Sequence, residues 1–319
     1  MKEQDFVARR AQDWDKLQAL LARGEVRLAS LSGQEVRELV RLHRRVSADL
    51  AYVRTVGTNP RLIQFLNDLV ARSAGVLYAH RRRGLAEGVS HLVREMAQAV
   101  RRQARWVWFA VLLEVVFSVF GWQVTLRDPS LTDVLVPPGF RESLEFWKEG
   151  TFSDLTATEG FAKTGFYVQN NTMATLFAAA GGMTFGLVSL YSMFINGVLM
   201  GVFLREVVAA GQLTHFLAGV LPHGVTESIG IYLGAAGGFV LAWAVIRPGE
   251  KTVGASLRAA GKDAALLIGL GIAMIWIAAP IEGWFSHQPA IPEAAKFAFA
   301  GFTLVIWLAY FLMAGREPS

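Results

Sequence analysis

The sequence predicts an all-α, polytopic helical membrane protein with about six transmembrane helices and an N-terminal cytoplasmic helical bundle. Three observations support this class. Hydrophobic residues make up 53% of the 319 residues, and the mean hydropathy is +0.36. After residue 105 they form uninterrupted runs long enough to cross a bilayer. Residues 1–105 are instead rich in arginine, with apolar positions spaced as on amphipathic helices.

We therefore expect two domains, a cytoplasmic helical domain at 1–105 and a transmembrane domain at 106–315 with an outer loop at 127–170. No signal peptide is expected, because charged residues occur throughout residues 1–30. Cysteine is absent, which excludes disulfides, thiolate nucleophiles and cysteine metal ligands.

The N-terminal domain is expected to be a small antiparallel bundle of amphipathic helices. An apolar stripe covers residues 4–23. Ser32 and Glu35 form the capping-box pattern that begins a second helix. The Gly-Thr-Asn-Pro run at 57–60 ends that helix, and a third follows over 61–83. A fourth helix then leads towards the membrane.

Two arginine runs precede the first span, Arg81-Arg82-Arg83 and Arg101-Arg102-x-x-Arg105. They could bind nucleic acid or anionic lipid. Alternatively they set the topology, because arginine beside a first span keeps that side in the cytoplasm. No nucleic-acid-binding motif accompanies them. We therefore favour topology, and we expect no nucleic-acid partner.

Six spans are expected, at residues 106–126, 172–191, 193–208, 223–246, 264–285 and 294–314. The arginine-rich flank before the first span and the acidic balance of the outer loop give a multi-pass protein of the inner (cytoplasmic) membrane with both termini cytoplasmic. The half-length apolar segment 216–221 is typical of a re-entrant or interfacial piece. Pro222 would then begin a new helix, where its missing N–H costs no hydrogen bond.

Polar residues inside the apolar runs are the candidate functional residues, because polar groups at membrane depth are costly. His223 and Glu227 are four apart, which places them on one face of a helix with Gly224 between them. Asn171 is expected to cap the second span, and Asn196 to mark a break before the third. Glu114 lies inside the first span.

Small residues recur at a spacing of four, a pattern that lets membrane helices approach closely. We expect helix packing at six of them, Gly182, Gly186, Gly197, Gly201, Gly230 and Gly234. Small-residue faces left free within the chain would favour a homo-oligomer.

Several short patterns lie in a fixed order along the chain. In the N-terminal domain they are Trp14-x-x-Leu17 with Leu20-Leu21, Leu42-His43-Arg44 leading to Asp49-Leu50-Ala51, and Leu66-Asn67-x-Leu69-Val70-Ala71-Arg72 ending in Leu77-Tyr78. In the membrane domain they are Asn170-Asn171, Gly181-Gly182-x-x-x-Gly186, Asn196-Gly197-x-x-x-Gly201 and Leu221-Pro222-His223-Gly224-x-x-Glu227. Together they resemble the stage II sporulation protein M family of integral membrane proteins.

What the resemblance implies is a membrane scaffold. The sporulation member is similar in its membrane portion and works with peptidoglycan-degrading partners. The long N-terminal domain is similar to that of a subgroup often encoded with a MoxR-type AAA+ ATPase. The expected function is therefore a non-enzymatic scaffold that recruits or anchors membrane and envelope proteins. The alternative is a transporter or permease-like subunit with an ion or proton site near His223 and Glu227.

Three interpretations of His223 and Glu227 remain open. They form a structural hydrogen-bond clasp, or an ion or proton site together with Glu114, Asn196 or Glu282, or the ligands of a metal-dependent hydrolase with His215 as the third. The two-histidine zinc motif, a Gly-x-Ser-x-Gly nucleophile and a phosphate-binding loop are all absent from the sequence. We accordingly expect no enzyme activity, no catalytic residue, no resident metal and no cofactor.

Overall fold

The computed structural model describes residues 3–24, 31–56, 59–77, 85–152 and 156–316, and every regular element in these ranges is a helix. Five of the helices are long and apolar enough to cross a membrane. The predicted all-α polytopic class is confirmed. The predicted turn at Gly57-Thr58, the pattern residue Tyr78 and the arginine run Arg81-Arg82-Arg83 lie outside the described residues.

The chain divides into two compact units, Met1–Gly88 and Val89–Ser319. The first contains α1 (Glu3–Gly24), α2 (Gly33–Val56) and α3 (Pro60–Leu77). Their apolar stripes meet in one core, whose fully buried residues include Leu17, Leu21, Leu39, Leu42 and Leu66. The predicted capping box forms: Ser32 N–H donates to Glu35 Oε2 over 2.7 Å, and Glu35 N–H donates to Ser32 Oγ over 3.3 Å.

The boundary between the units differs from the predicted one at 105/106, because most of α4 (Leu85–Arg102) belongs with the second unit. The guanidinium of Arg101 donates to Phe311 O (2.6 Å) and Ala314 O (2.7 Å). Arg102 pairs with Asp263 over 2.7 Å. Arg101, one of the arginines that were predicted to set the topology, thus also satisfies backbone carbonyls at the end of α12, where such groups lack helical partners.

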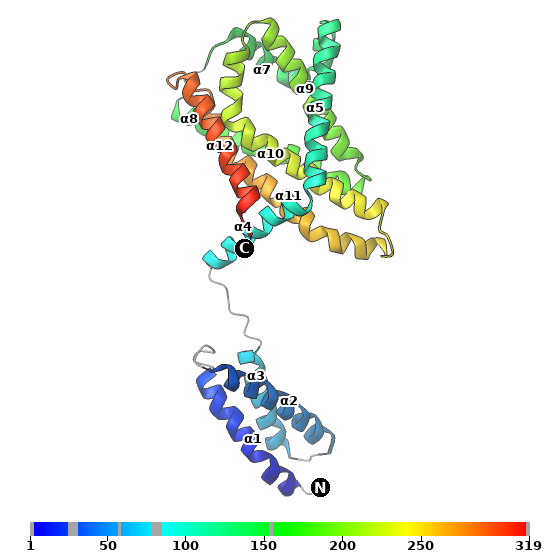
Figure 1. The fold of residues 1–319 in the computed structure, drawn as a ribbon, viewed down its shortest axis with the longest axis vertical. Coiled ribbons are helices and arrows are strands. Elements are labelled where there is room, and N and C mark those ends of the chain that lie inside the picture. The colour runs from blue at the N-terminus through cyan, green and yellow to red at the C-terminus, as the bar shows by residue number, and fades with distance from the viewer. Residues whose placement is uncertain (1–2, 25–30, 57–58, 78–84, 153–155, 317–319) are drawn as a thin grey trace. The chain divides into compact units, whose positions relative to one another are not determined.

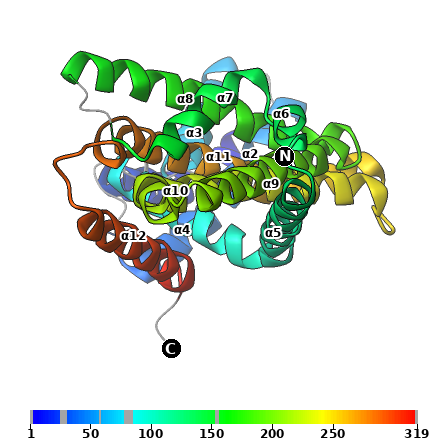
Figure 2. The same cartoon turned by 90° about the horizontal axis from the view of Figure 1, so that it is seen from above.

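The second unit continues with α5 (Ala104–Arg127), α6 (Leu131–Leu135), α7 (Pro138–Glu149), α8 (Ala157–Ala179), the 3₁₀ turn η2 (Ala180–Met183), α9 (Leu187–Ala209), α10 (Leu213–Ile246), α11 (Val253–Pro280), the π-helical turn η3 (Ile281–Ser286) and α12 (Glu293–Met313). The five candidate spans are α5, α9, α10, α11 continued by η3, and α12. Figure 2 shows α10 in the middle of this unit, with α8 on one side and α12 on the other, and α10 contacts both.

The predicted span 172–191 is not one helix. It is divided among the end of α8, the turn η2 and the start of α9. Phe185 and Gly186 have positive φ, 54° and 91°, which is the left-handed region that ends helices. Asn171 does not cap a helix: it lies inside α8 and accepts a hydrogen bond from Asn170 Nδ2 over 2.9 Å. The expected break at Asn196 is also wrong, because α9 continues through it and Asn196 Nδ2 donates to Ser192 O within the helix.

The predicted re-entrant piece at 216–221 is likewise wrong. Residues 213–246 form one helix, α10, with Pro222 inside it rather than at its start. Proline removes one helical hydrogen bond and is the usual cause of a sharp bend. Figure 1 shows that α10 changes direction along its length. The apolar surroundings of the segment favour continued helix, because a helix satisfies its backbone polar groups internally.

Glycines carry the closest helix contacts of this unit. A Cβ at Gly201 of α9 would collide with the Ser118 carbonyl oxygen of α5, and one at Gly230 of α10 would lie 2.8 Å from the Gly271 carbonyl oxygen of α11. Gly197, Gly234 and Gly182 similarly face Phe117, Thr175 and Leu241. Gly186 is the exception, since it forms the turn before α9. Other helices of the same chain pack against these small-residue faces. The homo-oligomer was predicted on the basis that such faces are free, and these faces are not free.

Candidate cation-binding site

The candidate site lies where the middle of α10 faces the π-helical turn that ends α11. His223 and Glu227 come from α10, one helical turn apart. Glu282 and Ser286 come from η3, which begins directly after Pro280. Single π-helical turns are rare and occur frequently at functional sites. The wider turn presents both residues towards α10.

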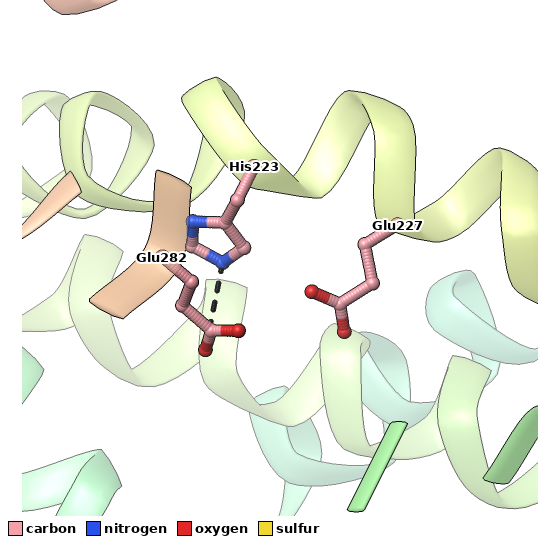
Figure 3. A group of neighbouring side chains, drawn as sticks. All are labelled: His223, Glu227 and Glu282. Carbon is pink, nitrogen blue, oxygen red and sulfur yellow. Dashed lines mark ion pairs between the residues drawn. The ribbon is translucent and has the colours of Figure 1, made fainter. Parts of the chain in front are cut away.

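The side chains of His223, Glu227 and Glu282 converge. One possible ligand atom from each lies within 4.8 Å of the other two. The imidazole Nε2 of His223 is 3.8 Å from Glu282 Oε1, and its Nδ1 shares a 2.8 Å hydrogen bond with Ser286 Oγ. Figure 3 shows the ring and the two carboxylates directed into a common space. The hydrogen bond to Ser286 orients the ring so that Nε2 faces the carboxylates.

The two carboxylates are incompletely satisfied. Within the described part of the chain, Glu227 Oε2 and Glu282 Oε2 are buried and have no hydrogen-bond partner. A buried polar atom without a partner costs free energy, and two carboxylates this close repel each other strongly at low dielectric. A cation between them would remove both costs.

The chemistry of this group of side chains suits a divalent metal ion. One imidazole nitrogen and two carboxylates are ligands that first-row transition metals accept. Two ligands of one metal, each at about 2.1 Å, lie about 3.0–3.4 Å apart. The 3.8 Å between His223 Nε2 and Glu282 Oε1 is therefore within a small side-chain movement of a metal-bound arrangement.

Helix α8 is the third element that contributes residues near the site, after α10 and η3. The phenol of Tyr167 lies close enough to Glu227 and Glu282 for electrostatic interaction, and Lys163 acts similarly on Glu282. Sequence reasoning missed both residues because it assigned them to the outer loop. The signal that could have placed them on a helix was the capping box of Thr156 and Glu159, which begins α8.

The other predicted polar residues lie elsewhere. Glu114 is on α5 with a buried, unpartnered Oε2, and Asn196 bonds within α9. Among the described residues neither joins the three metal-competent side chains, and neither does Asn171. The expectation of His215 as a third ligand beside His223 and Glu227 is wrong, because His215 Nδ1 faces Glu293 over 3.4 Å and Glu282 takes the third position instead.

An apolar cavity of ≈ 320 Å³ lies along another face of α10. It is lined by residues of α9, α10 and α12, among them Met200, Gly224, Ser228 and Leu304. His223, Glu227 and Glu282 are not among its lining residues. The cavity therefore does not open onto these three side chains.

The fold and the site define the class: an all-α, multi-pass membrane protein with a polar cluster inside its helical membrane unit. Residues 108–287 match the family model of stage II sporulation protein M. The chain belongs to this family, as its sequence patterns indicated. The match includes His223, Glu227, Glu282 and Ser286.

Residues 4–79 match a second model, described as a domain of unknown function (DUF8413). Searches of curated proteins and of solved structures gave no match. The N-terminal match covers α1 to α3, the helices that build the core of the first unit.

Proposed function

We propose that the chain is a cation-binding integral membrane subunit of the transport or permease type, in which His223, Glu227 and Glu282 hold a divalent metal ion. The observation that carries the proposal is the convergence of these side chains within 4.8 Å, with one buried, unpartnered oxygen on each carboxylate. Ionisable groups inside membrane segments usually face a pathway or a partner.

Prolines beside the site support a transport function. Pro222 directly precedes His223 in α10, and Pro280 precedes Glu282 by two residues at the end of α11. Many transporters build their ion sites from discontinuous helices, because the freed backbone groups add to the coordination. Here α10 stays continuous, but each proline leaves the carbonyl four residues earlier without its helical donor.

The proposal is tested by loading liposomes that contain the purified chain with a metal-sensitive dye. The wild-type chain is expected to conduct Zn²⁺ or Mn²⁺, and Glu227→Gln, which keeps the size of the side chain, is expected to abolish the flux. Glu250→Gln, in the exposed loop after α10, is the matched control. Wild-type flux no higher than that of empty liposomes would exclude transport.

A second function is favoured by the first unit. We propose that it recruits partners, as a membrane scaffold does, because it has its own core and its own family match, separate from the membrane unit. The partners proposed are envelope and membrane proteins, among them a MoxR-type AAA+ ATPase. Co-purification from native membranes should lose partners when residues 1–88 are removed and keep them in Glu227→Gln. Partners that persist after the removal would contradict the scaffold.

We also propose that the protein lies in the inner membrane, in contact with lipid and with both termini cytoplasmic. The basis is the positive-inside rule applied to Arg101, Arg102 and Arg105 before α5. A homo-oligomer stays an untested prediction, because the glycines on which it was based pack within the chain; a monomeric mass in mild detergent would count against it.

A further inference from the structure

A second cluster of ionisable side chains lies beside the proposed metal ligands His223, Glu227 and Glu282 but contains none of them. It forms where α7, the first turn of α10, the residue after η3 and the first turn of α12 meet. Its basic members are His215, His287 and Lys296. Aromatic rings surround them: Trp147 is 5.4 Å from the His287 ring and 6.1 Å from the His215 ring, and Phe152 is 3.8 Å from the His215 ring.

Lys296 is the most unusual member. Its side chain is 0% exposed, although lysine is almost never fully buried without a partner. Its Nζ has no hydrogen-bond acceptor within the described residues and sits 3.3 Å from the centroid of the Phe152 ring. An ammonium carries three donors, so the ring face leaves hydrogen-bonding capacity unused.

His287 adds a second unsatisfied group. It is 7% exposed, and neither ring nitrogen has a hydrogen-bond partner among the described residues. Burial, together with the positive charges of Lys163 and Lys296 and the nearby His215, lowers the pKa of His287 to about 4. The neutral ring still offers one N–H donor at neutral pH.

The carboxylate of Glu293 lies beside this cluster but does not complete it. Glu293 faces His215 Nδ1 over 3.4 Å and influences Lys296 electrostatically, but it makes no hydrogen bond to Nζ. Its side chain is 42% exposed, whereas Nζ is buried. The donors of Lys296 and His287 therefore point at no acceptor in the described part of the chain.

We propose that Lys296 and His287, flanked by His215, bind an oxyanion, either a lipid headgroup phosphate or free phosphate. The ammonium supplies the opposite charge and His287 a hydrogen bond, a combination that recognises phosphate oxygens. Basic pockets between membrane helices bind phosphate headgroups on the cytoplasmic side, and this cluster offers the same donor chemistry at the end that contains α7. The rings of Trp147 and Phe152 exclude water and thereby strengthen the charge interaction. The site neighbours the proposed metal site, because His287 directly follows Ser286 and acts electrostatically on His223, but the two sites share no proposed ligand.

The test measures how ligands shift the thermal unfolding midpoint of the full chain in detergent. Wild-type chain is titrated with sodium phosphate against sodium chloride at matched ionic strength, and with phosphatidylglycerol against phosphatidylcholine in mixed micelles. Saturating ligand is expected to raise the midpoint by about 3 °C. A response to inorganic phosphate identifies a free-phosphate site, and a response to phosphatidylglycerol alone identifies a headgroup site.

The variants are Lys296→Met, which keeps the apolar stem, and His287→Phe, which keeps an aromatic ring but removes the donor. Both are expected to lose the ligand-dependent shift, whatever their own midpoints. Lys148→Met is the matched control, because Lys148 of α7 is already paired with Glu145 over 2.9 Å. The proposal is overturned if wild type responds to neither ligand, or if Lys296→Met responds as wild type does.

Discussion

One imidazole nitrogen of His223 makes a hydrogen bond, which leaves the other nitrogen available as a metal ligand. Its Nδ1 is fixed by Ser286 over 2.8 Å, and Nε2 therefore faces Glu282. Outer partners of this kind orient a metal-binding imidazole and raise its affinity for the ion. The i,i+4 spacing of His223 and Glu227 made their proximity predictable from sequence. The pairing with Ser286 was not predictable, because it joins residues 63 apart through a π-helical turn.

Ser286→Ala should weaken divalent metal binding by roughly 10-fold or more, because the imidazole loses the hydrogen bond that fixes its orientation. Isothermal titration of the full chain in detergent measures the change. Ser143→Ala, on the exposed side of α7, is the control and should bind as wild type does. Equal affinity in Ser286→Ala would show that the hydrogen bond does not position the ligand.

The pKa of His43, in the first unit, is lowered by burial, and its Nδ1 lies 2.7 Å from Ser73 Oγ. Because the folded pKa is below the unfolded value, the unfolded state binds more protons on acidification. The contribution of His43 to stability is thus complete above the unfolded pKa of about 6.5 and is lost as the pH falls through the lowered value.

The protection factors of amides in α2 and α3, which correct for the intrinsic pH dependence of exchange, should consequently fall between about pH 6.5 and 5 in wild type, before most carboxylates titrate. His43→Gln, which keeps a polar group beside Ser73, should remove most of that fall. A variant whose protection factors fall equally over this range would assign the effect to other groups.

In the membrane unit, neighbouring helices approach each other closely at glycine residues, where no side chain separates the two backbones. Small-residue spacing identified most of these positions from sequence alone, including Gly201 and Gly230. Sequence reasoning failed at the element boundaries. It placed a helix start at Pro222, which lies inside the continuous helix α10, and it ran a span through the turn that Gly186 forms. Hydropathy cannot distinguish a turn of apolar residues from a helix.

Gly201→Ala should destabilise the chain by roughly 1–3 kcal/mol, because the new Cβ would collide with the Ser118 carbonyl oxygen of α5. The matched control is Gly261→Ala in α11, where no atom lies within 4 Å of the added Cβ. The control should be neutral or slightly stabilising, since alanine favours helix. Thermal unfolding in detergent compares the two, and equal midpoints would contradict the close contact.

At the scale of the whole membrane unit, side-chain contacts define two ends. At one end, Trp106 at the start of α5 contacts Trp243 near the end of α10, ring centroids 5.6 Å apart. At the other, Trp147 of α7 contacts Phe216 at the start of α10 and His287. We propose that α8 connects these two ends as a sixth crossing, although only five helices reach span-like hydropathy.

The course of α8 supports that proposal. A Cβ at Gly160, near its start, would meet the Trp284 ring of η3, and one at Gly238 of α10 would meet the carbonyl oxygens of Ala178 and Ala179 at its end. With α8 counted, six crossings keep both termini on one side, which is the topology that the arginine distribution predicted. The polar residues at the start of α8 explain why hydropathy placed the second span too late.

Single cysteines test this topology, because the native chain has none. Glu145→Cys on α7 should react with a membrane-impermeant maleimide in intact cells. Glu250→Cys and Arg316→Cys should react only after permeabilisation, since three crossings, α8 included, separate residue 145 from residue 250. Labelling of residues 145 and 250 from the same side would mean that α8 does not cross.

The central claim is that one divalent cation binds among His223, Glu227 and Glu282. Its most direct test is equilibrium titration of the purified full chain with Zn²⁺ and Mn²⁺, comparing wild type, Glu227→Gln and Glu114→Gln, a buried carboxylate of α5 outside the site. The account predicts one ion per chain, about 100-fold weaker binding in Glu227→Gln, and no change in Glu114→Gln. A wild-type chain that binds neither ion, or a Glu227→Gln chain that binds as wild type does, would contradict it.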